Sequence, residues 1–248
     1  TYGGGVFLST NKGTSWAPTN TGLTETYVSA LAVSGTNLYA GTYGGGIFLS
    51  TNKGTTWTAV NTGLTDLQVY ALAITPRSST GGTNLYAGTR GGSVFLSINS
   101  GAEWASFNTG LNGLAVTALA VSPASSGTGG TNVFAGSSGG GVFLSTSSGA
   151  SWTAANTGLT GTVVTALTYF GTNLYAGTEK SGAFLSTNGG TSWTPINTGL
   201  TNTNVRALAV IPNGVGSTNL FAGTGGSGVF LSTNSGSTWS PVNGGLTD

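Results

Sequence analysis

An internal repeat constrains the fold of this chain more than any other feature. The segment Ser-Thr-Asn-Lys-Gly-Thr-Ser-Trp at residues 9–16 returns five more times with small changes. Subtracting the positions of neighbouring tryptophans gives spacings of 41, 47, 48, 41 and 46 residues, for copies that end at Trp16, Trp57, Trp104, Trp152, Trp193 and Trp239. Repeats of this length are typical of β-propellers, in which each repeat is one blade of four short strands.

Each repeat contains four strand-like segments, which we name A to D. In the first full repeat, strand A is the apolar run 28–33, which suits a buried inner strand, and strand B lies within residues 35–42, which have turn residues on both flanks. Strand C is residues 47–50, and strand D is the stretch that begins at Trp57. No segment has a sustained helical period, and the 45 glycines would each cost about 1 kcal/mol in a helix. The sequence therefore predicts an all-β propeller of four-stranded antiparallel blades.

The repeats predict one domain over residues 1–248, because units that bury only one face need their neighbours. It consists of a C–D hairpin at 1–24 and units at about 25–65, 66–112, 113–160, 161–201 and 202–248. The chain holds six C–D copies but only five A–B copies, which begin at Val28, Val69, Val116, Val164 and Val205. We expect six blades, one of them incomplete, whose A–B hairpin comes from residues outside this sequence or from a neighbouring chain. The alternative is five blades with a spare hairpin. Unpaired strand edges favour self-assembly.

Composition excludes several classes of function. Charged residues make up 4% and the net charge is +1, so the chain has no electrostatic footprint for nucleic acid. Its apolar runs are far shorter than the roughly 18 residues of a transmembrane segment. Cysteine, methionine and histidine are absent, so we expect no disulfide, metal or cofactor. A surface of Ser, Thr and Asn predicts an extracellular or cell-surface protein, and the start at Thr1 without a leader indicates a mature piece.

The repeated segment resembles the Asp-box, or bacterial neuraminidase repeat, motif. That resemblance implies a β-propeller with the motif on each C–D turn, opposite the usual ligand face. The usual aspartate is asparagine or serine here, and these side chains still form the turn, with glycine at positive φ and tryptophan packed beneath. We expect all six tryptophans in the blade cores. The motif residues are Ser9, Asn11, Gly13 and Trp16; Ser50, Asn52, Gly54 and Trp57; Ser97, Asn99, Gly101 and Trp104; Ser145, Ser147, Gly149 and Trp152; Ser186, Asn188, Gly190 and Trp193; and Ser232, Asn234, Gly236 and Trp239.

The sequence argues against catalysis. The sialidases of this superfamily need three converging arginines, but Arg77, Arg90 and Arg206 are the only arginines, and the strand order places Arg77 on the other face. A glycosidase needs two carboxylates about 5–10 Å apart, whereas the five acidic residues are scattered over different blades. Histidine-dependent triads cannot form. We predict a protein that is not an enzyme and has no catalytic, cofactor or metal residues.

One face of the disc collects six of the eleven charged residues. D–A and B–C links should lie on that face, whereas A–B and C–D turns, including the lengthened loops at 75–81, 122–130 and 211–216, should lie on the other. The candidate ligand or partner face consists of Glu25, Tyr27, Tyr43, Asp66, Tyr70, Arg90, Glu179, Lys180 and Arg206.

Two functions remain, and both are binding functions. The first is an extracellular scaffold or an adhesion or protein-interaction module within a larger surface protein or assembly. The second is a lectin that binds surface glycans through Tyr2, Tyr27, Tyr43 and Tyr70; hydrolysis of glycosides is a remote third. A multivalent lectin should repeat its ligand residues, but this chain repeats only its core. The first hypothesis is therefore favoured.

Overall fold

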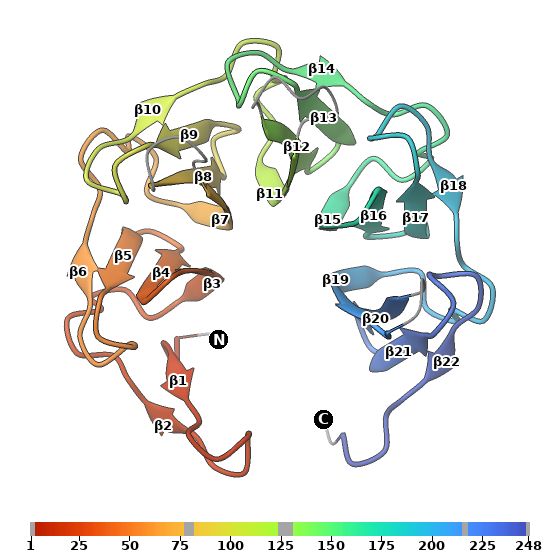
Figure 1. Ribbon diagram of the computed structural model, residues 1–248, viewed down its shortest axis with the longest axis horizontal. Helices are drawn as coiled ribbons and strands as arrows, with labels where there is room; N and C mark the ends of the chain where they lie inside the picture. The colour runs from red at the N-terminus through yellow and green to blue at the C-terminus, as the bar shows by residue number, and fades with distance from the viewer. Residues whose placement is uncertain (1–2, 77–81, 124–130, 215–217, 247–248) are drawn as a thin grey trace.

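Five four-stranded antiparallel sheets and one two-stranded sheet form an open ring in the computed structural model (Figure 1). The structure describes residues 3–76, 82–123, 131–214 and 218–246, and these ranges contain no helix. Each sheet uses consecutive strands of the chain. The predicted all-β propeller fold is confirmed.

The strands follow the four-segment pattern of the repeat. The two-stranded sheet, here called the half-blade, consists of β1 (Phe7–Leu8) and β2 (Ala17–Pro18). Five complete blades follow it. Blade 1 contains β3 (Val28–Ser34), β4 (Asn37–Thr42), β5 (Gly46–Ser50) and β6 (Thr58–Ala59); blade 2 contains β7 (Val69–Pro76), β8 (Thr83–Thr89), β9 (Val94–Ser97) and β10 (Ala105–Ser106); blade 3 contains β11 (Val116–Pro123), β12 (Thr131–Ser137), β13 (Val142–Ser145) and β14 (Thr153–Ala154); blade 4 contains β15 (Val164–Phe170), β16 (Asn173–Thr178), β17 (Gly182–Ser186) and β18 (Thr194–Pro195); blade 5 contains β19 (Val205–Pro212), β20 (Thr218–Thr224), β21 (Val229–Ser232) and β22 (Ser240–Pro241).

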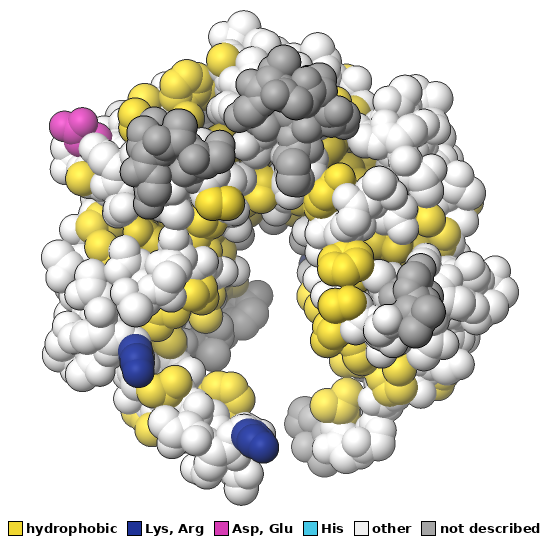
Figure 2. Space-filling view, viewed as in Figure 1, with side chains coloured by type: hydrophobic (Ala, Val, Ile, Leu, Met, Phe, Trp, Pro, Cys, Tyr) yellow, Lys and Arg dark blue, Asp and Glu magenta, His cyan; other side chains and the backbone are white. Residues whose placement is uncertain are grey.

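The blades are arranged around a central opening. The first strand of each complete blade lies innermost and the fourth lies on the rim, with the half-blade beside blade 1 (Figure 1). A gap separates the half-blade from blade 5. Among the described residues the half-blade has no A–B hairpin, as the count of repeated segments predicts. Figure 2 shows hydrophobic side chains along the inner edge of the ring and few charged side chains on the face it presents.

Each C–D turn is held by the same short-range hydrogen bonds. In blade 5 the Ser232 hydroxyl accepts the Gly236 N–H at 2.8 Å, and Asn234 Oδ1 accepts the Thr238 N–H at 2.9 Å. Gly236 has a φ of 92°, which glycine adopts without strain. Ser147, which replaces asparagine in blade 3, accepts the Ser151 N–H at 3.1 Å. Asparagine and serine side chains therefore both hold this turn.

A tryptophan joins each complete blade to the blade before it. The Trp57 indole N–H donates to the Thr19 carbonyl at 2.7 Å, and its backbone N–H donates to Thr21 at 2.8 Å. Equivalent indole bonds join Trp104 to Val60, Trp152 to Phe107, Trp193 to Ala155 and Trp239 to Ile196. These five tryptophans are 3–5% exposed. The hydrophobic cores accordingly combine residues from neighbouring blades, as when Tyr39 of blade 1 clusters with Trp104 of blade 2.

Trp16 departs from the expectation that all six tryptophans are buried. It belongs to the half-blade and is 62% exposed. The expectation is wrong at this position because a buried tryptophan packs on strand B of its own blade and on the preceding blade, as Trp104 does, and beside the gap Trp16 has neither. The turn that carries Trp16 still forms, since the Ser9 hydroxyl accepts the Gly13 N–H at 2.7 Å.

Candidate binding face

The D–A and B–C links lie together on one face of the ring, as the strand order predicts. The Tyr43 N–H donates to the Tyr27 carbonyl at 3.0 Å, and Asp66 Oδ2 accepts the Gly91 N–H at 2.7 Å. On the other face, an A–B link meets a C–D turn where Asn213 Nδ2 donates to the Thr233 carbonyl at 3.4 Å. Three residues weighed in the sequence, Tyr2, Arg77 and Asp248, lie outside the described residues.

Three tyrosines form a row on the first of these faces. The ring centroids of Tyr27 and Tyr43 are 5.3 Å apart, and those of Tyr43 and Tyr70 are 5.8 Å apart with an interplanar angle of 28°. The Arg90 guanidinium lies 6.0 Å from the Tyr43 ring centroid, at the outer limit of a cation–π contact. Arg90 Nη1 also donates to Gln68 Oε1 at 3.0 Å. The row is therefore a partly buried aromatic surface that ends at a cation.

The row leads into a hollow at the mouth of the central channel. This hollow, of about 500 Å³, collects side chains from four blades. It is lined by Tyr70, Arg90, Ala115, Thr117, Ser138, Thr165 and Arg206. Arg90 and Arg206 are both exposed, whereas Tyr70 is half-buried. Two guanidinium groups beside a phenol and several hydroxyls provide donors that suit a carboxylate or another planar anion.

Tyr70 and Arg206 differ from the residues at the same position in the other blades, which is the second residue of each inner strand. The five equivalent residues are Ser29, Tyr70, Thr117, Thr165 and Arg206. In blades 1, 3 and 4 the hydroxyl at this position lies within hydrogen-bond distance of a glycine carbonyl in its own blade and of a valine carbonyl in the next. We call this pair of contacts the hydroxyl bridge. Blades 2 and 5 carry Tyr70 and Arg206 instead, and both line the hollow.

The two acids of the D–A links have structural roles. Glu25 Oε1 accepts the Tyr27 N–H at 2.8 Å, and Asp66 Oδ1 accepts the Gln68 N–H at 3.0 Å. In blade 5, Asn202 makes the same bond to the Asn204 N–H at 2.9 Å, without a charge. A carboxylate is thus one of several side chains that can close this turn.

The predicted face is assembled in part. Tyr27, Tyr43, Tyr70 and Arg90 come together, Asp66 and Glu25 hold the links beside them, and Arg206 lies across the same hollow. Glu179 and Lys180 belong to the link between β16 and β17 and line neither the tyrosine row nor the hollow.

Sequence reasoning missed several polar residues of this face. Gln68 orients Arg90, and Thr117, Ser138 and Thr165 line the hollow. The Asn204 Oδ1 atom, two residues before Arg206, is buried and has no hydrogen-bond partner among the described residues. Aligning the repeats position by position would have pointed to these residues, because Gln68 and Asn204 are equivalent to Tyr27, Thr117 and Thr165 to Tyr70, and Ser138 to Tyr43.

The electrostatics of Tyr70 reflect its surroundings. Burial raises the pKa of its phenol above the usual 10.0, and the neighbouring Tyr43 and Asp66 raise it further. The positive charge of Arg90 acts in the opposite direction and lowers that pKa. At neutral pH Tyr70 is therefore a neutral hydrogen-bonding group beside a permanent cation.

The described residues contain no cluster of three or more acidic, histidine or cysteine side chains that could hold a metal ion. Within the same ranges there is also no apolar helix of membrane-spanning length.

Comparisons with known proteins place the fold but not a family. No model of a known protein family matches this sequence, and no curated protein sequence matches it. Solved structures of β-propellers are similar. The GH74 xyloglucanase from Xanthomonas campestris superimposes with a TM-score of 0.62 at 17% identity, over 84% of this chain and 38% of the enzyme.

Two further structures give the same picture. YCF48 bound to D1 peptide matches with a TM-score of 0.62 at 15% identity, over 92% of this chain and 71% of that protein. The computationally designed Ika8 protein matches with a TM-score of 0.61 at 16% identity, over 86% of this chain and 60% of the design. This chain thus spans less than two thirds of the xyloglucanase and of the design. At these identities the likeness establishes the propeller fold alone.

Proposed function

We propose that this chain is a non-catalytic protein-interaction module that binds a carboxylate-bearing peptide segment at the mouth of its channel. One observation carries the proposal: the tyrosine row ends in a hollow with Arg90 on one side and Arg206 on the other. Aromatic rings supply contact area with little loss of side-chain entropy, and guanidinium groups bind carboxylates in a directional way. Tyrosine and arginine are also the residue types that dominate binding energy at protein interfaces.

The repeat pattern supports a binding role for these residues. In blades 1, 3 and 4 the second residue of the inner strand has a structural role, because it forms the hydroxyl bridge to the next blade through Ser29, Thr117 or Thr165. Tyr70 and Arg206 replace that hydroxyl on two blades that face each other across the hollow. Similar propellers include YCF48, which was solved with a bound peptide, so the fold is compatible with such a role.

The acidic residues of the D–A links, Glu25 and Asp66, support a binding function rather than glycoside hydrolysis. A glycosidase needs one carboxylate to transfer a proton and another to act on the sugar ring or on water. Glu25 and Asp66 instead accept backbone N–H groups of their own D–A links, and Asp66 also accepts the Gly91 N–H of a B–C link. We place the protein outside the cell or on its surface, because it combines an uncharged polar surface with the absence of cysteine, methionine and histidine.

Peptide arrays test this proposal. Random peptides with a free C-terminal carboxylate should bind better than the same peptides amidated at that end. Arg90→Gln and Arg206→Gln should each weaken the best binder about tenfold, because each removes one charge-assisted hydrogen bond. Lys180→Gln, a charge change on the same face but outside the hollow, is the matched control and should leave binding unchanged. Equal binding of free and amidated peptides would contradict the carboxylate site.

A sugar ligand is the second candidate, because a half-buried tyrosine platform beside hydroxyl groups also suits a pyranose ring. Under this hypothesis Tyr43→Ala should abolish binding on a glycan array, while Arg206→Gln should have little effect on neutral sugars. The peptide proposal predicts loss with both variants. The two candidates are therefore separated by the response to Arg206.

A further inference from the structure

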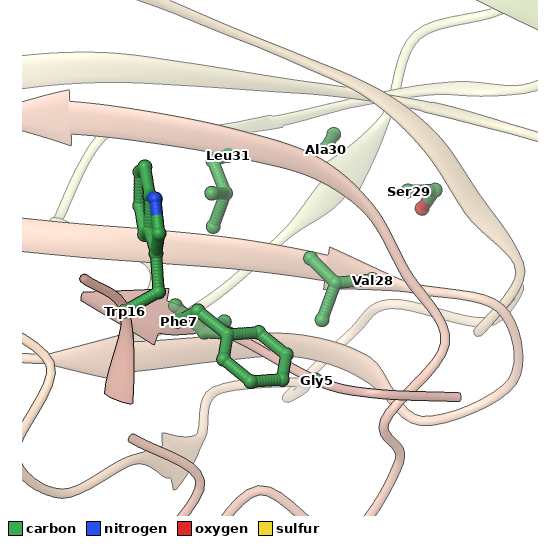
Figure 3. A pocket seen from close by; sticks show the side chains of 8 residues that line it. Gly5, Phe7, Trp16, Val28, Ser29, Ala30 and Leu31 are labelled. Atoms are coloured by element: carbon green, nitrogen blue, oxygen red, sulfur yellow. The ribbon is translucent and has the colours of Figure 1, made fainter. Parts of the chain in front are cut away.

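The half-blade leaves bare the surfaces that an A–B hairpin covers in every complete blade. Phe7 is 40% exposed, whereas its five equivalents are buried. On the facing side of blade 1, Leu31 and Val33 are 59% and 62% exposed. Figure 3 shows Phe7, Trp16, Val28 and Leu31 around the resulting hollow, which has a volume of about 600 Å³.

The free edge of β1 has the hydrogen-bonding pattern that a further strand requires. The Val6 N–H donates to Asn20 Oδ1 at 2.7 Å, and the Val6 carbonyl accepts the Thr19 N–H at 2.9 Å, so both groups are used on the β2 side. Because successive residues of a strand direct these groups to alternate edges, those of Phe7 face the other way. In blade 1 the equivalent residue, Phe48, pairs with Ala40 of the B strand.

Blade 5 carries the matching surface on the other side of the gap. In blades 1 to 4 a strand-B glycine lets the first valine of the next blade approach closely. A Cβ built on Gly41, Gly88, Gly136 or Gly177 would lie 2.5–2.7 Å from a Cγ1 atom of Val69, Val116, Val164 or Val205. On Gly223 a Cβ would meet only the Cβ of Ala207, at 3.6 Å. Gly223 thus keeps room for a valine that the described residues do not supply.

We propose that this open junction, formed by Phe7, Trp16, Leu31, Val33 and Gly223, binds one further β-hairpin of the chain's own A–B type, which the described residues do not supply. The five hairpins inside the chain define the chemistry of the occupant. Its first strand carries valine against Gly223, then a small hydroxyl residue and an alternation of alanine and leucine. Its second strand pairs antiparallel with the Phe7 edge. This is strand addition to an open sheet edge, with backbone hydrogen bonds for affinity and apolar pockets for selectivity.

A synthetic hairpin with the sequence of residues 28–42 tests the proposal on the 248-residue chain. Its ends are covalently linked, because isolated two-stranded hairpins are only marginally stable in water. Trp16 is the one exposed tryptophan, so binding should shift the tryptophan emission to shorter wavelength and saturate at one peptide per chain. The same peptide with Ala40→Pro should cause no shift, since proline removes a backbone donor from the strand that meets Phe7.

Variants of the protein separate this binding from a general loss of structure. Gly223→Val should weaken peptide binding at least tenfold and leave the melting temperature unchanged, because the new side chain points into the space reserved for the peptide valine. Ser106→Val, on an exposed rim strand, is the matched control for added apolar surface and should bind normally. Trp16→Phe should lose the emission shift while calorimetry still detects binding.

Three results would overturn the proposal. They are no saturable binding to the unmodified chain, an unchanged affinity in Gly223→Val, and a dimer of the unmodified chain that buries Trp16 without any peptide. The last result would make a second copy of this chain the occupant. None of these outcomes bears on the channel-mouth site, which lies on different residues.

Discussion

Trp16 and Trp193 occupy the same place in the repeat but have opposite environments. Both follow a turn in which a serine hydroxyl accepts a glycine N–H, at 2.7 Å from Ser9 and at 2.9 Å from Ser186. Trp193 is buried and donates to the Ala155 carbonyl of the preceding blade at 2.8 Å, whereas Trp16 is exposed beside the gap. The comparison separates two kinds of information. The motif encodes a local turn, and burial of its tryptophan is a property of the junction between neighbouring blades.

The largest expected effect tests this separation directly. Trp193→Ala should lower the free energy of unfolding by about 3–5 kcal/mol, because it leaves a cavity and an unpaired carbonyl in a closed junction. Trp16→Ala should lower it by less than about 1 kcal/mol, since little apolar surface returns to water. Chemical denaturation followed by circular dichroism measures both values. Similar losses for the two variants would show that the junction does not determine the contribution of the tryptophan.

A second prediction contrasts the hydroxyl bridge with the residues that replace it. Thr165→Val keeps the shape of the side chain but removes the donor to Gly177 and to Val205 of the next blade. It should cost about 1–2 kcal/mol of stability, because the carbonyls at the junction lose a partner. Arg206→Thr should change stability by less than about 0.5 kcal/mol, since Arg206 is exposed.

Ligand binding should respond in the reverse order. Arg206→Thr should weaken peptide binding at the channel mouth about tenfold, and Thr165→Val should retain most of it. Thermal melting and peptide titration on the same two samples make the comparison. If Thr165→Val left stability unchanged, or if Arg206→Thr lowered it, the structural role of the hydroxyl bridge would be contradicted.

The sequence was sufficient to predict the structure of the repeated parts of this molecule, because the same pattern of strand and turn residues occurs in each repeat and each copy supports the same assignment. Six copies of one turn and five inner strands predicted the all-β propeller and the missing hairpin. The exposure of Trp16 could not be read from its own motif, because it depends on a neighbour that the local sequence does not encode. The tyrosine row joins Tyr43, at the end of β4, to Tyr70, near the start of β7. Only the packing of blade 1 on blade 2 brings those rings to 5.8 Å.

A smaller effect is expected where the turn itself varies. In blade 3 Ser147 accepts the Ser151 N–H at 3.1 Å and its hydroxyl lies 3.3 Å from that of Ser151. The longer Asn188 of blade 4 makes both contacts at shorter distances, accepting the Ser192 N–H at 2.9 Å and donating to the Ser192 hydroxyl at 2.9 Å. Ser147→Asn should therefore stabilise the protein by about 0.5–1 kcal/mol. Asn188→Ser, the reciprocal variant, should lose a similar amount. The denaturant midpoints of the two variants measure both changes. If the midpoint did not rise in Ser147→Asn and did not fall in Asn188→Ser, asparagine would not be the better residue for this turn.

The smallest effect compares a tyrosine at the channel mouth with one in a closed junction. Burial raises the phenol pKa of both Tyr70 and Tyr86 above 10.0, but Tyr70 also feels Arg90, which lowers its pKa. A raised phenol pKa means that the folded state holds its proton more tightly than the unfolded state. The resulting stability is fully present below pH 10 and is lost as the pH rises through the folded pKa. Arg90→Gln should move the phenolate absorbance of Tyr70 to still higher pH, identified by subtracting the titration of Tyr70→Phe, and should leave Tyr86 unchanged. A shift of Tyr70 to lower pH would mean that Arg90 acts through packing rather than charge, and it would remove the electrostatic link between the tyrosine row and the hollow.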